Sequence, residues 1–157
     1  MLSKLAKANL YLKVFGLTKI PLLWFCRPKI ICMNKELVEI KIPLRRRTKN
    51  HLNSMYFGAL SVGADITGGF LAMMCIEKSK RKVALIFKDF KADFLKRAEG
   101  DVHFKCNEGL EISQLVEETI KSGHRENMVV HIEALVPSIS NDLVAKFELT
   151  LSLKNKT

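Results

Sequence analysis

The stretch LNSMYFGALSVGADITGGFLAMMCI, residues Leu52 to Ile76, carries a single charged side chain, Asp65. Its apolar residues recur at helical spacing, and the opposite face is apolar too, which is typical of a helix that is enclosed on all sides. Each of its four glycines costs about 1 kcal/mol relative to alanine in a helix, so we expect neighbouring side chains to approach the backbone closely. The stretch therefore predicts a buried central helix.

Asp65 also bears on where this helix lies. The stretch is long enough to cross a bilayer, but a charge at the centre of a span is penalised in lipid, and the strands that follow need a helix to pack on. We therefore expect a core helix. For the carboxylate itself two interpretations stay open: a buried group capped by the hydroxyls of Ser61 or Thr67, or a catalytic acid or base.

Alternating apolar residues predict strands on both sides of this helix. Before it we expect strands over 29–33 and 37–44, joined by a turn at Asn34 and Lys35. After it we expect a strand over 83–94 bulged near Lys88, a strand over 102–106, a helix over 114–122 capped by Ser113, and strands over 128–136 and 143–154. This order predicts an α+β domain in which a curved antiparallel sheet wraps around the helix.

The first 28 residues are expected to form an N-terminal helical extension, and residues 29–157 the main domain. An amphipathic helix is predicted first, and a second apolar segment runs from Pro21 to Pro28. Lysines interrupt the apolar runs, so the segment does not resemble a cleavable signal peptide. Two interpretations of the apolar stripe stay open, docking onto the domain or weak contact with an anionic membrane surface. The stripe consists of Leu2, Leu5, Leu10, Val14 and Leu17.

Lys and Arg outnumber Asp and Glu by 26 to 16, and the resulting net charge of +10 favours anionic partners. A nucleic acid is not expected, because exposed aromatic residues do not alternate with the basic ones. The four cysteines form no CxxC pair and lie in apolar patterns, which indicates reduced, buried thiols in a cytoplasmic protein. The histidines lack ligand spacing, so we expect no metal. No cofactor is expected either.

Asn50, Tyr56, Phe57, Gly58 and Asp65 carry a resemblance to the hot-dog fold thioesterases, most similar to the phenylacetyl-CoA thioesterase branch. In that branch an Asn precedes a loop that ends in His-Gly-Gly at a helix start, and a catalytic Asp follows. Here Tyr56 and Phe57 stand where the branch has His and Gly. The resemblance covers about residues 29 to 154 and implies a hot-dog fold and acyl-CoA thioesterase activity.

The resemblance also implies roles for these residues. Asp65 is the expected general base or nucleophile, the backbone N–H groups of Phe57 and Gly58 the oxyanion hole, and Asn50 the residue that orients water or substrate. Gly58 and Asp65 are seven residues apart, which separates them by roughly 10 Å along a helix. We therefore expect an active site shared between the subunits of a homodimer, and a dimer of dimers stays open as a larger assembly.

Substrate contacts are expected from His51, Tyr56, Arg81 and Lys82. Basic groups at residues 45–47 and 78–82 flank the helix and are candidates for holding the phosphates of coenzyme A. Solvated surface charge is the alternative for each group. Loss of the His-Gly pair also leaves a second function open, that of a non-catalytic protein that binds acyl-CoA or fatty acyl groups in a pocket lined by Tyr56 and Phe57.

Overall fold

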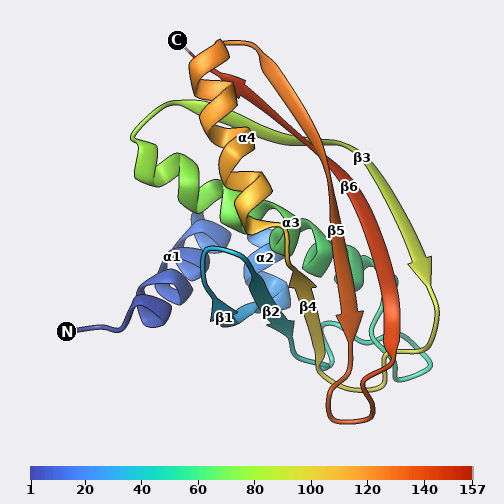
Figure 1. Ribbon diagram of the computed structural model, residues 1–157. Helices are drawn as coiled ribbons and strands as arrows, with labels where there is room; N and C mark the ends of the chain where they lie inside the picture. Colours follow the sequence, from blue (N-terminus) through green and yellow to red (C-terminus); the bar gives the residue numbers. More distant parts are fainter. Residues whose placement is uncertain (157) are drawn as a thin grey trace.

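The structure, a computed structural model, describes residues 1–156, which form one antiparallel sheet and four helices (Figure 1). The elements in chain order are α1 (Lys4–Thr18), α2 (Pro21–Cys26), β1 (Lys29–Met33), β2 (Val38–Ile42), α3 (Phe57–Ser79), β3 (Val83–Phe94), β4 (Val102–Cys106), α4 (Gly109–Ser122), β5 (Arg125–Leu135) and β6 (Leu143–Asn155). The strand order in the sheet is β1-β2-β4-β5-β6-β3. The predicted α+β class is confirmed.

Figure 1 shows α3 lying across the inner side of the curved sheet, with α1 and α2 on the far side of α3. The middle of α3 is enclosed: Ala64, Phe70 and Ala72 are fully buried. Gly63 explains how the sheet comes so close, because a Cβ at this position would collide with the ring of Phe104 on β4. Although α3 is long and apolar enough to span a membrane, most of it is buried, as expected of a core helix.

The strand predictions hold apart from their ends, and the predicted bulge in β3 is confirmed. The register between β3 and β6 shifts between Phe87 and Phe90. At this bulge Asp89 links the two strands, because its carboxylate accepts hydrogen bonds from the backbone N–H and the hydroxyl of Thr150 on β6 at 3.0 and 2.8 Å. The turn at Asn34 is confirmed as well, because its side chain accepts from the N–H groups of residues 36 and 37.

The predicted start of α4 is wrong. The helix begins at Gly109, not at residue 114, and its N-cap residue is Glu108, not Ser113. The reason is a tertiary contact: the N–H of Gly109 donates to the carbonyl of Glu36 at 2.8 Å, and a Cβ at Gly109 would collide with that backbone. The glycine that looks like a loop residue in the sequence is what lets the helix start against the β1–β2 turn.

The N-terminal helix docks on the domain, but not through the predicted stripe. Its buried residues are Ala8, Leu12 and Gly16, while Leu10, Val14 and Leu17 are each at least half exposed. Ala8 and Leu12 belong to the same hydrophobic core as α3. Small side chains at positions 8 and 16 let the helix lie close to its neighbours, which the larger leucines of the stripe do not allow. The division of the chain at residue 28 stays a prediction.

The two edges of the sheet differ. At β1, the side-chain amide of Asn9 on α1 donates to the carbonyl of Ile30 and accepts from its N–H, at 3.0 and 2.9 Å, so α1 covers this edge. At the other edge, β3 pairs with β6 on one side and with no strand of the described residues on the other. An uncovered edge of this length is a ready site for pairing with another chain.

The four cysteines are free. Cys26 and Cys106 are buried as predicted, and burial raises the pKa of the Cys106 thiol to about 11. Cys32 is exposed and Cys75 is only partly buried, so the prediction of a buried thiol is wrong for these two residues. The register of β1 shifts between Ile30 and Cys32, so the side chain that alternation would place inside faces outward.

Candidate active site

One stripe of α3 is left partly open by the rest of the chain. Gly58, Ser61, Val62 and Asp65 lie at spacings of three or four residues, so they share one face of the helix, and each is only partly buried. The following turns of the helix are mostly buried. The stripe thus connects the start of α3 with its one acidic side chain in this half of the helix.

The start of α3 has free hydrogen-bond donors. Tyr56 is the N-cap residue, and its own N–H donates to the carbonyl of Thr48 at 2.7 Å. No side chain caps the helix. Within residues 1–156, the N–H groups of Phe57, Gly58 and Ala59 donate no hydrogen bond. Unpaired amides at the positive end of a helix dipole favour an anion or a polarised carbonyl.

Glycine at position 58 shapes this helix start. A Cβ there would meet ring atoms of Tyr56, so the Tyr56 ring lies directly against the Gly58 backbone. The rings of Tyr56 and Phe57 lie 4.7 Å apart, and both side chains are about half exposed. The amides are thus bordered by an apolar aromatic surface, which would exclude water from one side of a bound group.

Asp65 lines a cavity of about 530 Å³ that lies between α1, α2, α3 and β3. Burial raises the pKa of its carboxyl above the usual value. In the part of the chain that the structure describes, no hydrogen bond or ion pair reaches this carboxylate. The capped interpretation is wrong, because the hydroxyl of Ser61 donates to the Phe57 carbonyl at 2.9 Å and that of Thr67 has no partner.

Sequence reasoning missed the wall of this cavity. Tyr11 and Phe15 of α1, with rings stacked 6.2 Å apart, line it together with residues of α3 and β3. Burial, and to a lesser degree Glu77, raises the pKa of Tyr11. Aromatic residues four apart in α1 were a signal for a buried face, but only the tertiary structure places that face beside Asp65.

Asn50 and His51 lie in the loop before α3. The side-chain oxygen of Asn50 accepts hydrogen bonds from the N–H groups of Leu52 and Ser54, at 2.9 and 3.2 Å, and lies 3.3 Å from the Ser54 hydroxyl. This arrangement fixes the loop that leads into α3. Within residues 1–156 the side-chain nitrogen of Asn50 has no hydrogen-bond partner, and His51 is exposed at the tip of the loop.

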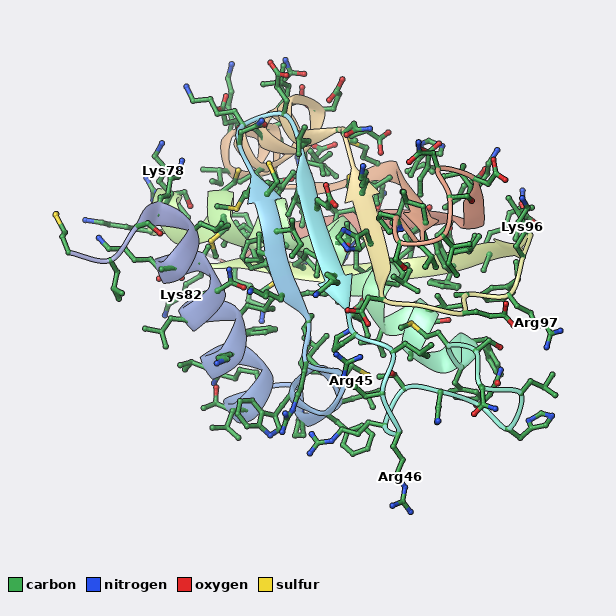
Figure 2. All side chains as sticks on the ribbon, turned by 90° about the horizontal axis from the view of Figure 1, so that it is seen from below. Arg45, Arg46, Lys78, Lys82, Lys96 and Arg97 are labelled. Carbon is green, nitrogen blue, oxygen red and sulfur yellow. The ribbon has the colours of Figure 1, made fainter. Side chains whose placement is uncertain are left out.

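The structure does not bring the two predicted basic groups together. Figure 2 shows Arg45 and Arg46 well apart from Lys78 and Lys82. Arg81 and Lys82 are exposed and follow the C-terminal end of α3, and 23 helical residues, roughly 35 Å, separate them from its start. Within one chain, therefore, Arg81 and Lys82 lie far from Tyr56, Phe57 and Gly58. Among the described residues, no group of three His, Cys, Asp or Glu side chains is placed to hold a metal ion.

Comparison with solved structures identifies the fold. The chain superposes on a probable thioesterase of Pseudomonas aeruginosa, PA5026, with a TM-score of 0.75 and 22% identity, covering 94% of this chain and 95% of that one. The thioesterase HI1161 of Haemophilus influenzae gives 0.70 at 17% identity, covering 99% and 93%. A Chlorobaculum tepidum protein of unknown function gives 0.82 at 11% identity, covering 96% of each chain. These likenesses establish the hot-dog fold that the sequence predicted.

The sequence itself matches one family. A domain of unknown function, DUF4442, matches residues 9–153, which include most of α1 and all of α2. No curated protein matches the chain significantly. The protein therefore belongs to the DUF4442 family, and its fold is that of the hot-dog thioesterases.

Proposed function

We propose that this protein is a thioester hydrolase that acts on acyl-CoA, with an active site shared between two subunits. The observation that carries the proposal is the pairing, on one open stripe of α3, of free helix-start amides with an unpartnered carboxylate in an apolar cavity. Thioester hydrolysis needs both a donor for the developing oxyanion and a base for water. The likeness to thioesterases supports the same chemistry.

In the proposed reaction the Asp65 carboxylate takes a proton from a water molecule, and the hydroxide attacks the thioester carbonyl carbon. Alternatively, the Asp65 carboxylate attacks that carbon directly and displaces the thiolate, which forms an acyl anhydride on Asp65. Water then hydrolyses this anhydride to regenerate Asp65 and release the free acid, whose proton passes to the thiolate. The oxygen that gains negative charge accepts hydrogen bonds from the N–H groups of Phe57 and Gly58. In the general-base route, collapse of the tetrahedral intermediate breaks the C–S bond, and the proton held by Asp65 passes to the leaving thiolate.

A second subunit solves the distance problem between the two parts of this site. α3 and β3 run antiparallel: Phe57 lies by Phe94, and Gly69 lies by Phe87. If the open edge of β3 pairs with its copy about a two-fold axis near Lys91, the start of α3 in one subunit faces Asp65 in the other. The open β3 edge supports this homodimer, and a dimer of dimers remains compatible with it.

The aromatic surface at the helix start bears on the acyl group. Phe57 contacts Phe94, whose ring lies 6.0 Å from that of the buried Phe147, so an apolar path leads from the surface toward the core. A phenylacetyl group or another apolar acyl group would suit this surface. The same aromatic residues favour the second candidate, a non-catalytic protein that binds acyl-CoA or fatty acyl groups.

A panel of acyl-CoAs that includes phenylacetyl-CoA and straight chains of several lengths tests the proposal. Release of free thiol is measured for the wild type and for Asp65→Ala. Turnover that depends on Asp65 supports the hydrolase, whereas tight binding without such turnover supports the binding protein. If neither turnover nor binding occurs with any member of the panel, both candidates are wrong.

Arg81 and Lys82 stay predicted contacts for coenzyme A. Replacing both with alanine should raise KM for acyl-CoA while leaving KM for the matching N-acetylcysteamine thioester, which lacks the phosphates, unchanged. The two substrates share the reacting carbonyl, so the difference isolates the phosphate contacts. Equal KM values of wild type and variant for acyl-CoA would show that these residues are solvated surface charges that do not contact coenzyme A.

A further inference from the structure

The outward face of α1 is apolar, which is unusual for a helix on the surface of a soluble domain. Leu10, Val14 and Leu17 lie at i, i+4 and i+7 and are 53%, 51% and 57% exposed. On its other side, the helix packs into the hydrophobic core through Ala8 and Leu12. No element of the described chain covers this outward stripe.

Two lysines border the stripe. At 100° per residue, Lys7 and Lys13 project about 60° to either side of Leu10. Both are exposed. An apolar stripe with lysines along both margins matches a helix that lies in a membrane interface, with its apolar side chains among the acyl chains and its ammonium groups at the headgroups.

A groove continues this surface from α1 onto α2. It has a volume of about 760 Å³, and Leu10 and Lys13 line it together with Trp24 and Arg27. The other lining residues are Ala6, Asn9, Leu12, Leu23, Pro28 and Lys29, so the groove contains three basic residues and no acidic one. Trp24 is 41% exposed, and tryptophan prefers the boundary between water and acyl chains.

An arginine extends the basic margin beyond α2. The guanidinium carbon of Arg47 lies 5.3 Å from the centre of the Phe25 ring, which is itself about half exposed. This contact joins the basic residues 45–47 to the α2 side of the surface. Figure 2 shows Arg46 projecting from the same loop into solvent.

Charge decides which partner fits. The first 35 residues contain seven Lys or Arg and no Asp or Glu, although the whole chain carries a net charge of only +10. None of these seven forms an ion pair within residues 1–156. A second copy seated on this face by two-fold symmetry would place the same cationic surface against itself. Anionic headgroups would instead gain roughly 1 kcal/mol for each basic residue near them.

We propose that the α1–α2 face binds the surface of an anionic lipid bilayer. Leu10, Val14, Leu17 and Trp24 enter the interface, and Lys7, Lys13 and Arg27 contact the headgroups. The face lies on the side of α3 away from the sheet (Figure 1), so β3 keeps its open edge when the protein is bound. This inference does not depend on the proposed hydrolase activity.

Trp24 is the only tryptophan of the chain, so its fluorescence reports on this face directly. The 157-residue protein is mixed with vesicles of phosphatidylcholine alone or of phosphatidylcholine with phosphatidylglycerol, and binding is also measured by co-sedimentation. We expect a blue shift and co-sedimentation with the anionic vesicles, weaker at high salt. No binding to anionic vesicles, or equal binding to neutral ones, would overturn the proposal.

Matched variants locate the surface without changing net charge. Leu10→Gln/Val14→Gln should weaken vesicle binding by about tenfold, because two apolar side chains are lost from the interface. Val129→Gln/Ile139→Gln, at exposed positions outside α1 and α2, should bind like the wild type. Thermal unfolding confirms that both variants fold. Equal binding by both double variants would place the lipid contact elsewhere.

Analytical ultracentrifugation without lipid tests the alternative that a second copy of the protein covers this face. If a second copy covers this face, Leu10→Gln/Val14→Gln should lower the oligomeric state, and Trp24 emission of the wild type should shift with protein concentration. Those two results would overturn the membrane proposal. An oligomeric state that both double variants share with the wild type supports it, given lipid binding by the wild type.

Discussion

The ring of Phe57, the first residue of α3, lies 6.3 Å from the ring of Phe94, the last residue of β3. This contact places the free amides of the helix start next to the uncovered edge of the sheet. A chain that pairs with this edge therefore also reaches the helix start. In the proposed homodimer, these two rings would connect the pairing edge of β3 with the helix start.

A charge on the edge strand should break the proposed dimer. Phe90 is 44% exposed on β3, and a carboxylate there would have to be desolvated at a pairing edge. We expect Phe90→Glu to be monomeric by analytical ultracentrifugation and to lose acyl-CoA hydrolysis. Val129→Glu, equally exposed on the interior strand β5, is the control and should stay dimeric. A wild-type monomer would contradict the shared site.

Replacing Asp65 should separate activity from stability. Asp65→Asn removes the base, and kcat should fall by about a thousandfold. Burial raises the pKa of Asp65, so the folded state binds its proton more tightly than the unfolded state does. The ionised carboxylate therefore destabilises the fold at neutral pH, and Asp65→Asn should raise Tm there.

The pH dependence of this gain is the check on its cause. Below the ordinary pKa of an aspartate, the carboxyl is protonated in both states, so the difference in Tm between wild type and Asp65→Asn should vanish. Differential scanning calorimetry across acid and neutral pH measures it. A gain that persists unchanged at acid pH would show that burial of charge is not its source.

Gly58→Ala should trade activity for stability. Alanine is favoured over glycine in a helix by up to about 1 kcal/mol, but the added methyl group would push the Tyr56 ring away from the helix start. We expect an unchanged or higher free energy of unfolding and a fall in kcat/KM of about tenfold, because the amides lose their geometry toward the carbonyl. Unchanged kcat/KM would argue against these amides as the oxyanion hole.

Two substitutions distinguish the two roles considered for Asn50, which are fixing the loop and contacting the substrate. Asn50→Ala removes the acceptor that holds the N–H groups of Leu52 and Ser54, and should cost about 1 kcal/mol of stability. Asn50→Asp keeps that acceptor and should keep the stability. If Asn50→Asp also keeps full activity, the residue only fixes the loop. A loss of activity at wild-type Tm assigns its amide nitrogen to the substrate.

Thr67 carries the one buried side-chain oxygen that lacks a partner within residues 1–156. Valine has nearly the same shape without the hydroxyl, so Thr67→Val should stabilise the fold by about 1 kcal/mol in urea unfolding. Thr119→Val is the matched control, because the buried Thr119 hydroxyl donates to the Leu115 carbonyl at 2.7 Å. The control should be destabilised, and an equal effect of both substitutions would contradict the assignment.

The sequence by itself determined the architecture. A single charge within Leu52 to Ile76 and alternation on both sides predicted a core helix inside an antiparallel sheet, since burial patterns are local and periodic. The same residues pointed to the hot-dog fold, which the solved structures confirm. The helix start and Asp65 were likewise found as candidates from the sequence.

Only the tertiary structure decided which faces are used. The leucine stripe of α1 turned outward because Ala8 and Leu12 fit the core more closely, and α4 began early because Gly109 meets the β1–β2 turn. The cavity beside Asp65 is lined by Tyr11 and Phe15, more than 40 residues away in the chain. Periodicity shows that a helix has a buried face, but the choice between two apolar faces depends on long-range packing.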